Sequence, residues 1–222
     1  MVTKVKDSAT FGPVEHALAA ADPQLGQVIR SVIPKIGRLK VKVSKTPHFE
    51  ALVRAILYQR MTANGAEAVF KRLKQSMNGA MNPGKVIKLG GQGLKNLGFS
   101  DAKAHYTLNL ANWFLTNRQT ANQLANMSND EISDALTRIP GIGKWTVNVF
   151  LIFNLGRSDV IPASDFGIQR AVQAAYGLKK LPAPAEILRR ALLWKPYRSL
   201  ASMYLWQSVK LKSSRELRNS KT

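Results

Sequence analysis

Residues 136–153 have the sequence LTRIPGIGKWTVNVFLIF, in which two apolar helical segments flank the turn PGIG at 140–143. A little upstream, Ser128 and Glu131 have the spacing of a capping box and mark the start of the first helix. Proline stops a helix, and glycine adopts backbone angles that other residues avoid. The stretch therefore predicts a helix-hairpin-helix motif, although an ordinary corner between two helices would use glycine in the same way.

This hairpin has the chemistry of an anion site. Gly141 and Gly143 carry no side chain, so the N–H groups of the turn and of the next helix can point outward together. They would lie at the positive end of that helix, where a phosphate group binds well. Lys144 adds a positive charge at the same place. Contacts of this kind hold a phosphate backbone without distinguishing one base from another.

Composition supports a polyanionic partner. The chain has 222 residues, with 33 Lys and Arg against 13 Asp and Glu, which gives a formal net charge of +20. Such an excess favours nucleic acid first and an anionic membrane surface second. The absence of Cys excludes disulfides, thiolate metal sites and a cysteine nucleophile, and three scattered His argue against a His-based metal site. We see neither a membrane span nor a signal peptide.

The remaining pattern is almost entirely helical. Strand-like alternation is confined to LKVKV at 39–43, which could equally be an extended loop. Elsewhere, apolar positions recur at helical spacing, for example across 48–76, and short loops join the segments. Helices without strands between them predict an all-α fold.

Four further segments surround the hairpin and make the chain recognisable. They are FEALVRAILYQRMT (49–62), LKNLGFSDAKAHY (94–106), DVIPASDFGIQRA (159–171) and WKPYRSLASMYLW (194–206). Together with the hairpin, and in this order, they resemble the helix-hairpin-helix DNA glycosylase superfamily, and within it the 3-methyladenine DNA glycosylase II (alkylpurine) family.

The resemblance implies a two-lobed helical fold without the N-terminal β lobe of larger family members. We expect residues 1–222 to form a single glycosylase unit. One lobe would span 50–160 and hold the hairpin, and the other would combine 1–49 with 161–222.

The resemblance also implies an enzyme of base excision repair, which flips an alkylated purine such as 3-methyladenine or 7-methylguanine out of DNA and hydrolyses its N-glycosidic bond. The family's catalytic aspartate follows a Pro-x-x-Asp pattern, which Pro162 to Asp165 match. Departure of the base builds positive charge on the sugar, and a fixed carboxylate stabilises that charge and can activate water. Asp165 also stands where a helix N-cap is expected, and one residue can serve both roles.

A second implication concerns Trp145. Bifunctional relatives place a Schiff-base lysine at the corresponding position, so tryptophan there favours a monofunctional enzyme without strand cleavage. An aromatic face attracts the cationic base of a methylated purine. Trp145, Trp206 and Tyr58 are the predicted pocket residues, and the alternative is that these rings simply belong to the core.

A flipped nucleotide leaves a gap in the base stack, which a side chain must fill. In the family this plug comes from the turn after the first matched helix, here Gln59-Arg60-Met61-Thr62, with Arg60 at the wedge position. Arg60 could instead be a solvated helix-end residue, and Arg198 and Ser199 could brace the fold rather than contact phosphate. The predicted DNA contacts are Gly141, Gly143, Lys144, Thr146, Arg60, Met61, Thr62, Arg198 and Ser199.

No side chain is expected to bind a metal or cofactor, while a monovalent cation bridging the hairpin backbone and a DNA phosphate is compatible with the motif. The expected partner is double-stranded DNA containing alkylated bases, bound by a monomer. The expected location is a bacterial or archaeal cytoplasm, or a nucleus. Two other functions stay open at this point, a non-enzymatic helix-hairpin-helix DNA-binding protein and a bifunctional glycosylase/lyase.

Overall fold

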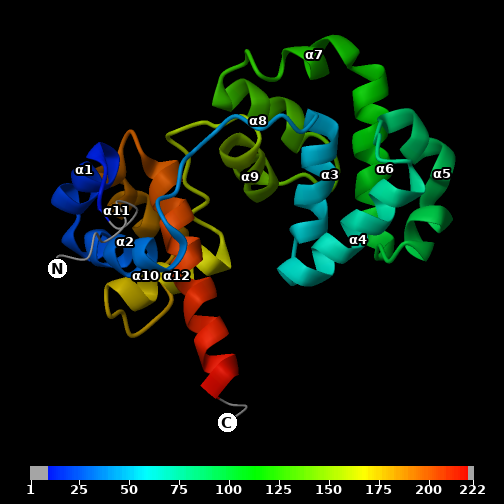
Figure 1. Ribbon diagram of the computed structural model, residues 1–222. Helices are drawn as coiled ribbons and strands as arrows, with labels where there is room; N and C mark the ends of the chain where they lie inside the picture. The colour runs from blue at the N-terminus through cyan, green and yellow to red at the C-terminus, as the bar shows by residue number, and fades with distance from the viewer. Residues whose placement is uncertain (1–9, 220–222) are drawn as a thin grey trace, which may run out of the picture. The chain divides into compact units, whose positions relative to one another are not determined.

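A computed structural model of the chain describes residues 10–219, with side chains over 10–212 (Figure 1). Between residues 10 and 219 there are helices and loops but no strand, which confirms the all-α prediction. The alternating segment 39–43 is a loop and not a strand. The chain divides into two compact units, Val43–Gly156 and Met1–Lys42 with Arg157–Thr222.

The unit Val43–Gly156 is built around one apolar helix. It contains α3 (His48–Tyr58), α4 (Ala63–Ser76), α5 (Pro83–Asn96), α6 (Asp101–Thr116), α7 (Arg118–Gln123), α8 (Asn129–Thr137) and α9 (Lys144–Phe153). Leu52, Val53, Ile56 and Leu57 recur at helical spacing and are fully buried. Through them α3 packs against α4, α6 and α9, while α5 lies along α6 (Figure 1).

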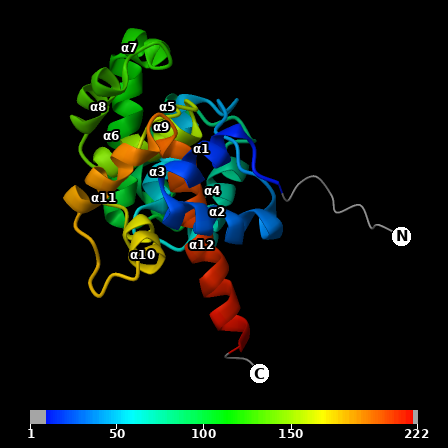
Figure 2. The ribbon, with the colours of Figure 1, turned by 90° about the vertical axis from the view of Figure 1, so that its left-hand side faces the viewer.

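The other unit joins the two ends of the chain. It contains α1 (Pro13–Ala21), α2 (Pro23–Ile36), α10 (Phe166–Ala175), α11 (Pro184–Arg190), the 3₁₀ turn η2 (Ala191–Trp194) and α12 (Arg198–Asn219). Helix α12 packs against α2 and α10, and its C-terminal part extends beyond them (Figure 2). Ile29 and Val32 of α2, together with Trp194 and Tyr204, lie fully buried in this core.

Two buried carboxylates fix the N-terminal helices in this unit. Glu15 accepts hydrogen bonds from Arg38 at 3.0 Å and from the hydroxyl of Tyr204 at 2.9 Å. Asp22 accepts from the indole nitrogen of Trp194 at 2.7 Å and from the hydroxyl of Tyr176. Burial and the neighbouring carboxylate raise the pKa of the Tyr204 hydroxyl, so that it stays protonated and keeps donating. The N-terminal helices are therefore bonded to residues far along the chain.

The unit Val43–Gly156 begins and ends somewhat earlier in the chain than the predicted lobe 50–160. Hydrogen bonds at the two boundaries explain both differences. Asn154 accepts the backbone N–H of Ser44 at 2.8 Å, which brings the residues before α3 into the unit 43–156. At the other boundary, the backbone N–H of Ser199 donates to Ser158 at 3.0 Å. That bond attaches the residues after 156 to α12.

Candidate functional site

The predicted hairpin is present between α8 and α9. The Ser128–Glu131 capping box starts α8, and a tight turn closes with the N–H of Ile142 donating to the carbonyl of Ile139 at 3.0 Å. Gly141 has φ +97°, and a Cβ there would stand 2.0 Å from the Tyr106 ring. Glycine is thus required at this position by both its backbone angle and its close contact.

Gly143 serves the hairpin differently. It is the N-cap of α9 with an extended backbone at φ −99°, which any residue can adopt, so the expectation of a special backbone angle is wrong here. A Cβ at Gly143 would meet nothing within 4 Å. As a cap it offers no side-chain acceptor to the N–H groups of the first turn of α9, and the exposed Lys144 follows it. This open, positively charged helix terminus suits an external anion.

Two side chains, one directly after α3 and one from α6, donate hydrogen bonds to the hairpin. The amide nitrogen of Gln59 donates to the carbonyl of Gly141 at 2.9 Å and to the hydroxyl of Thr146 at 2.8 Å. Asn109 donates to the carbonyl of Pro140 at 3.3 Å. Neither Gln59 nor Asn109 is among the site residues predicted from the sequence, and the local signal for Gln59 is a polar amide directly after an apolar helix.

Thr146 was predicted to contact DNA, and for its side chain this prediction is wrong. Thr146 is 1% exposed, and its hydroxyl accepts the hydrogen bond from Gln59. Thr146 lies in the first turn of α9 and faces the unit's interior, because the helix buries its apolar side there, with Val147 and Phe150. Only the backbone of Thr146 is left for a phosphate contact.

The predicted plug turn follows α3. Arg60 is exposed and has φ +49°, an uncommon conformation for a residue with a side chain. Thr62 caps α4 by accepting the N–H of Gly65 at 3.2 Å, and the half-buried Met61 lies beside that helix start. Arg60 therefore combines exposure with a constrained backbone, while the exposed Thr62 is already engaged as a helix cap.

Tyr58 lies in a charged network rather than in an apolar pocket. Its hydroxyl donates to Glu67 at 3.1 Å, and Arg54 forms an ion pair with the same carboxylate at 2.7 Å. The Arg54 guanidinium also stacks over the Tyr58 ring at 5.7 Å. The contacts of Tyr58 that the structure shows are those of a residue joining α3 to α4.

Asp165 is held in a fixed orientation by two donors. It is the N-cap of α10, and its Oδ1 accepts the N–H of Ile168 at 2.8 Å, which confirms the expected capping role. The same oxygen accepts the indole N–H of Trp206 at 2.8 Å. A Cβ at Gly167 would lie 3.0 Å from this oxygen and 3.1 Å from the Trp206 ring, so glycine keeps the contact open. A half-buried carboxylate with such support is suited to stabilise a developing cation.

Arg198 and Ser199 brace the fold, the second of the two roles that the sequence left open. The Arg198 guanidinium binds Asp159 through two nitrogens, at 2.6 and 2.9 Å, and lowers the pKa of that carboxyl. Ser199 is fully buried, and its hydroxyl donates to Arg157 and accepts from Val160. A DNA contact by the Ser199 side chain is therefore wrong.

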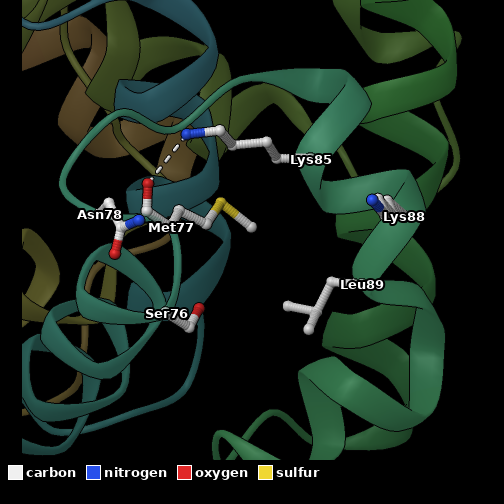
Figure 3. A pocket seen from close by; sticks show the side chains of 6 residues that line it. All are labelled: Ser76, Met77, Asn78, Lys85, Lys88 and Leu89. Atoms are coloured by element: carbon white, nitrogen blue, oxygen red, sulfur yellow. Dashed lines mark hydrogen bonds between the residues drawn. The ribbon is translucent and has the colours of Figure 1, made fainter.

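One surface cavity of about 330 Å³ lies between the end of α4 and the start of α5 (Figure 3). Its lining residues are Ser76, Met77, Asn78, Lys85, Lys88 and Leu89. Lys85 donates to the carbonyls of Met77 and Ala80 at 2.9 and 3.1 Å, so its charge caps a helix end. With neither a carboxylate nor an aromatic ring in this lining, the cavity is not a candidate for the glycosidic chemistry considered above.

Within residues 10–219 we find no helix with the length and apolar character that a membrane crossing requires. Over the described part of the chain, no cluster of three or more His, Asp or Glu could hold a metal ion.

Comparison with known proteins places these features in a family context. The family model described as "HhH-GPD superfamily base excision DNA repair protein" matches residues 53–196. DNA-3-methyladenine glycosylase 1 of Schizosaccharomyces pombe is 31% identical over 172 residues, which cover 76% of this chain and 75% of that protein. The alkylbase DNA glycosidase-like protein mag2 of the same organism is 29% identical over 216 residues, covering 93% and 97%.

A solved structure agrees with these matches. The S. pombe 3-methyladenine DNA glycosylase Mag1 in complex with abasic DNA superposes with a TM-score of 0.78 at 28% identity. The match covers 90% of this chain and 97% of the other.

Proposed function

Because this chain belongs to the HhH-GPD superfamily of base excision DNA repair proteins and is a DNA glycosylase that hydrolyses N-glycosyl bonds, we propose that it is a monofunctional glycosylase for alkylated purines. In this proposal the enzyme flips the damaged nucleotide out of the duplex, releases the base and leaves an abasic site. Asp165 is the catalytic residue. The observation that carries the proposal is the carboxylate of Asp165, fixed by the N–H groups of Ile168 and Trp206.

The chemistry follows from that fixed carboxylate. As the bond to the base lengthens, the sugar becomes an oxocarbenium ion, and a negative charge that is already oriented stabilises it without rearrangement. Because both supporting donors bind Oδ1, they set the plane of the whole carboxylate. The same group can orient or deprotonate the water that attacks the sugar.

The side chain at position 145 supports hydrolysis rather than an imine mechanism. Trp145, at the second position of α9, has no amine with which to form a Schiff base. The neighbouring Lys144 lies about 100° around the helix from it and is exposed beside the anion site. We assign Lys144 to phosphate binding.

Aromatic rings support the choice of alkylated purines. Methylation at N3 or N7 gives a purine a positive charge, which the face of an indole attracts. Trp145 and Trp206 are both half-buried, and Trp206 bonds to Asp165 through the N–H at the edge of its ring. The names of the S. pombe relatives, a 3-methyladenine glycosylase and an alkylbase glycosidase-like protein, point to the same substrates.

Double-stranded DNA is the polymer that this surface suits. The net charge of +20, the open N-terminus of α9 and Lys144 attract its phosphate backbone. Binding as a monomer, a location in a bacterial or archaeal cytoplasm or in a nucleus, and a monovalent cation on the hairpin stay predictions.

The test is release of bases from duplex DNA treated with a methylating agent, with the products separated by chromatography. We expect free 3-methyladenine and 7-methylguanine and intact abasic strands. Treatment with borohydride during the reaction should trap no enzyme on the DNA. A borohydride-trapped complex would contradict the monofunctional mechanism and indicate a bifunctional enzyme. Alkylated DNA that keeps all its bases would contradict the proposed substrate class.

A further inference from the structure

Gln59 connects the plug turn to the hairpin through both hydrogens of its side-chain amide. The amide nitrogen lies 2.9 Å from the carbonyl oxygen of Gly141 and 2.8 Å from the hydroxyl of Thr146. Because a backbone carbonyl can only accept, the group that faces Gly141 must be the NH₂ and not the amide oxygen. The orientation of this side chain is thus decided by its partners.

The two acceptors lie on either side of the phosphate-binding part of the hairpin. Gly141 is in the turn, Thr146 is in the first turn of α9, and Gly143 and Lys144 stand between them. Thr146 is almost completely buried, so the connection is made on the inner side of the hairpin, away from solvent. Gln59 is therefore bonded to the hairpin on both sides of Gly143 and Lys144 without occupying the face that binds phosphate.

The other end of the connection is Arg60, the residue that the sequence predicts as the plug. Arg60 follows Gln59 directly, is exposed and has φ +49°. That conformation costs a residue with a side chain roughly 1–2 kcal/mol, so the surroundings must hold it. A second anchor lies just before the turn, where the amine of Lys103 donates to the carbonyl of Leu57 at 2.6 Å. Burial lowers the pKa of this amine.

We propose that Gln59 is a positioning residue that fixes the distance between the phosphate-binding hairpin and the plug at Arg60. Docking of the hairpin on the DNA backbone then delivers Arg60 to the base stack in the same movement. The inference rests on the proposed function, because base flipping is the event that needs a plug. A misplacement of about 1 Å can lower a catalytic rate by roughly 100-fold, which is why such spacing matters.

The experiment uses the full chain and its Gln59→Met variant, which keeps the length of the side chain and removes the amide. The probe is a duplex with a stable abasic-site analogue next to 2-aminopurine, whose fluorescence reports insertion of a side chain into the stack. Affinity for undamaged duplex is measured in parallel by anisotropy. Thermal unfolding checks that each variant is folded.

At saturating protein, Gln59→Met should lose most of the fluorescence change that wild type shows. Its affinity for undamaged duplex should stay close to wild type, because the hairpin still binds phosphate. Its rate of base release should fall by about 10- to 100-fold. Gln92→Met is the matched control, since the Gln92 amide donates to Asn96 on the exposed side of α5, and it should behave as wild type.

Thr146→Val tests the same connection from the side of the hairpin. It removes one acceptor of the Gln59 amide and should reduce the fluorescence change less than Gln59→Met does. The double variant should be no worse than Gln59→Met alone, because the two residues act through one contact. Additive losses in the double variant would overturn the coupling.

A merely structural role gives a different result. In that case Gln59→Met would unfold at a lower temperature and bind all DNA more weakly, with an unchanged fluorescence change per bound complex. That result overturns the inference, as does a wild-type complex without any fluorescence change. Failure of the proposed function gives a separate result. A Gln59-dependent fluorescence change without release of alkylated purines would contradict the proposed substrate class and leave the positioning role of Gln59 in place.

Discussion

The indole N–H of Trp206 donates to Oδ1 of Asp165 at 2.8 Å, and the N–H of Ile168 donates to the same oxygen at the same distance. One donor comes from α12 and the other from the first turn of α10. The carboxylate is therefore a helix cap whose orientation is completed by a residue distant in sequence.

Replacing Trp206 by Phe should slow base release while leaving the ring in place. A hydrogen bond to a charged group contributes about 1.5–3 kcal/mol, so its loss should lower the single-turnover rate by about 10- to 100-fold. Trp113→Phe, on α6, serves as a control for the substitution itself. A Trp206→Phe enzyme as fast as wild type would show that the N–H does not orient Asp165.

Gly167→Ala should disturb the same contact by crowding. The new Cβ would stand 3.0 Å from Oδ1 of Asp165 and 3.1 Å from the Trp206 ring, closer than such atoms normally approach. We expect a loss of about tenfold in the base-release rate, because the carboxylate or the indole has to shift from its bonded position. Gly91→Ala, where the nearest atom would lie at 3.8 Å, should keep full activity. Equal rates for both variants would contradict this explanation.

The two hairpin glycines should respond differently to alanine. Gly141→Ala forces a side chain into a positive-φ conformation and against Tyr106, and should lower the free energy of unfolding by about 2 kcal/mol or more in urea titrations. Gly143→Ala has space and an ordinary backbone angle, so it should stay as stable as wild type but bind duplex DNA more weakly. Anisotropy with a labelled duplex measures the second effect. Equal affinity of Gly143→Ala and wild type would show that no DNA phosphate binds at this position.

Glu15 should make stability depend on pH. Burial by itself would raise the pKa of Glu15, but hydrogen bonds, led by that from Arg38, lower it from its ordinary value of 4.5. A folded pKa below the unfolded one means that the stabilisation is present above about pH 4.5 and is lost as pH falls through the folded pKa. Glu15→Gln should weaken this dependence and reduce the free energy of unfolding at neutral pH by about 1–3 kcal/mol. Urea titrations over a pH series give the free energy of unfolding at each pH. If it changed with pH equally in wild type and Glu15→Gln, the role of Glu15 would be rejected.

Local signals in the sequence predict much of this structure. Ser128 with Glu131, and the turn at 140–143, are decided within a few residues and appear as predicted. Asp165 likewise caps α10 through the N–H of Ile168, three residues on. Such features need only the neighbours along the chain, so a single sequence suffices to find them.

Contacts between distant residues could not be predicted. Gln59 and Gly141 are 82 positions apart, and Asp165 and Trp206 are 41 apart. Burial is likewise decided by the packed unit, which is why Thr146 and Ser199 were expected at the DNA but lie in the interior. Helical spacing shows which side of a helix is apolar without showing which polar neighbours meet there.

The most direct test of the central claim compares wild type with Asp165→Asn in one assay. Asparagine is also a good N-cap, so α10 should keep its start, and the variant should bind a duplex with an abasic-site analogue as tightly as wild type. Its single-turnover release of 3-methyladenine from methylated duplex should fall by about 100-fold or more, because the charge that stabilises the sugar cation is gone. Release at the wild-type rate by a folded, DNA-binding Asp165→Asn enzyme would contradict the account.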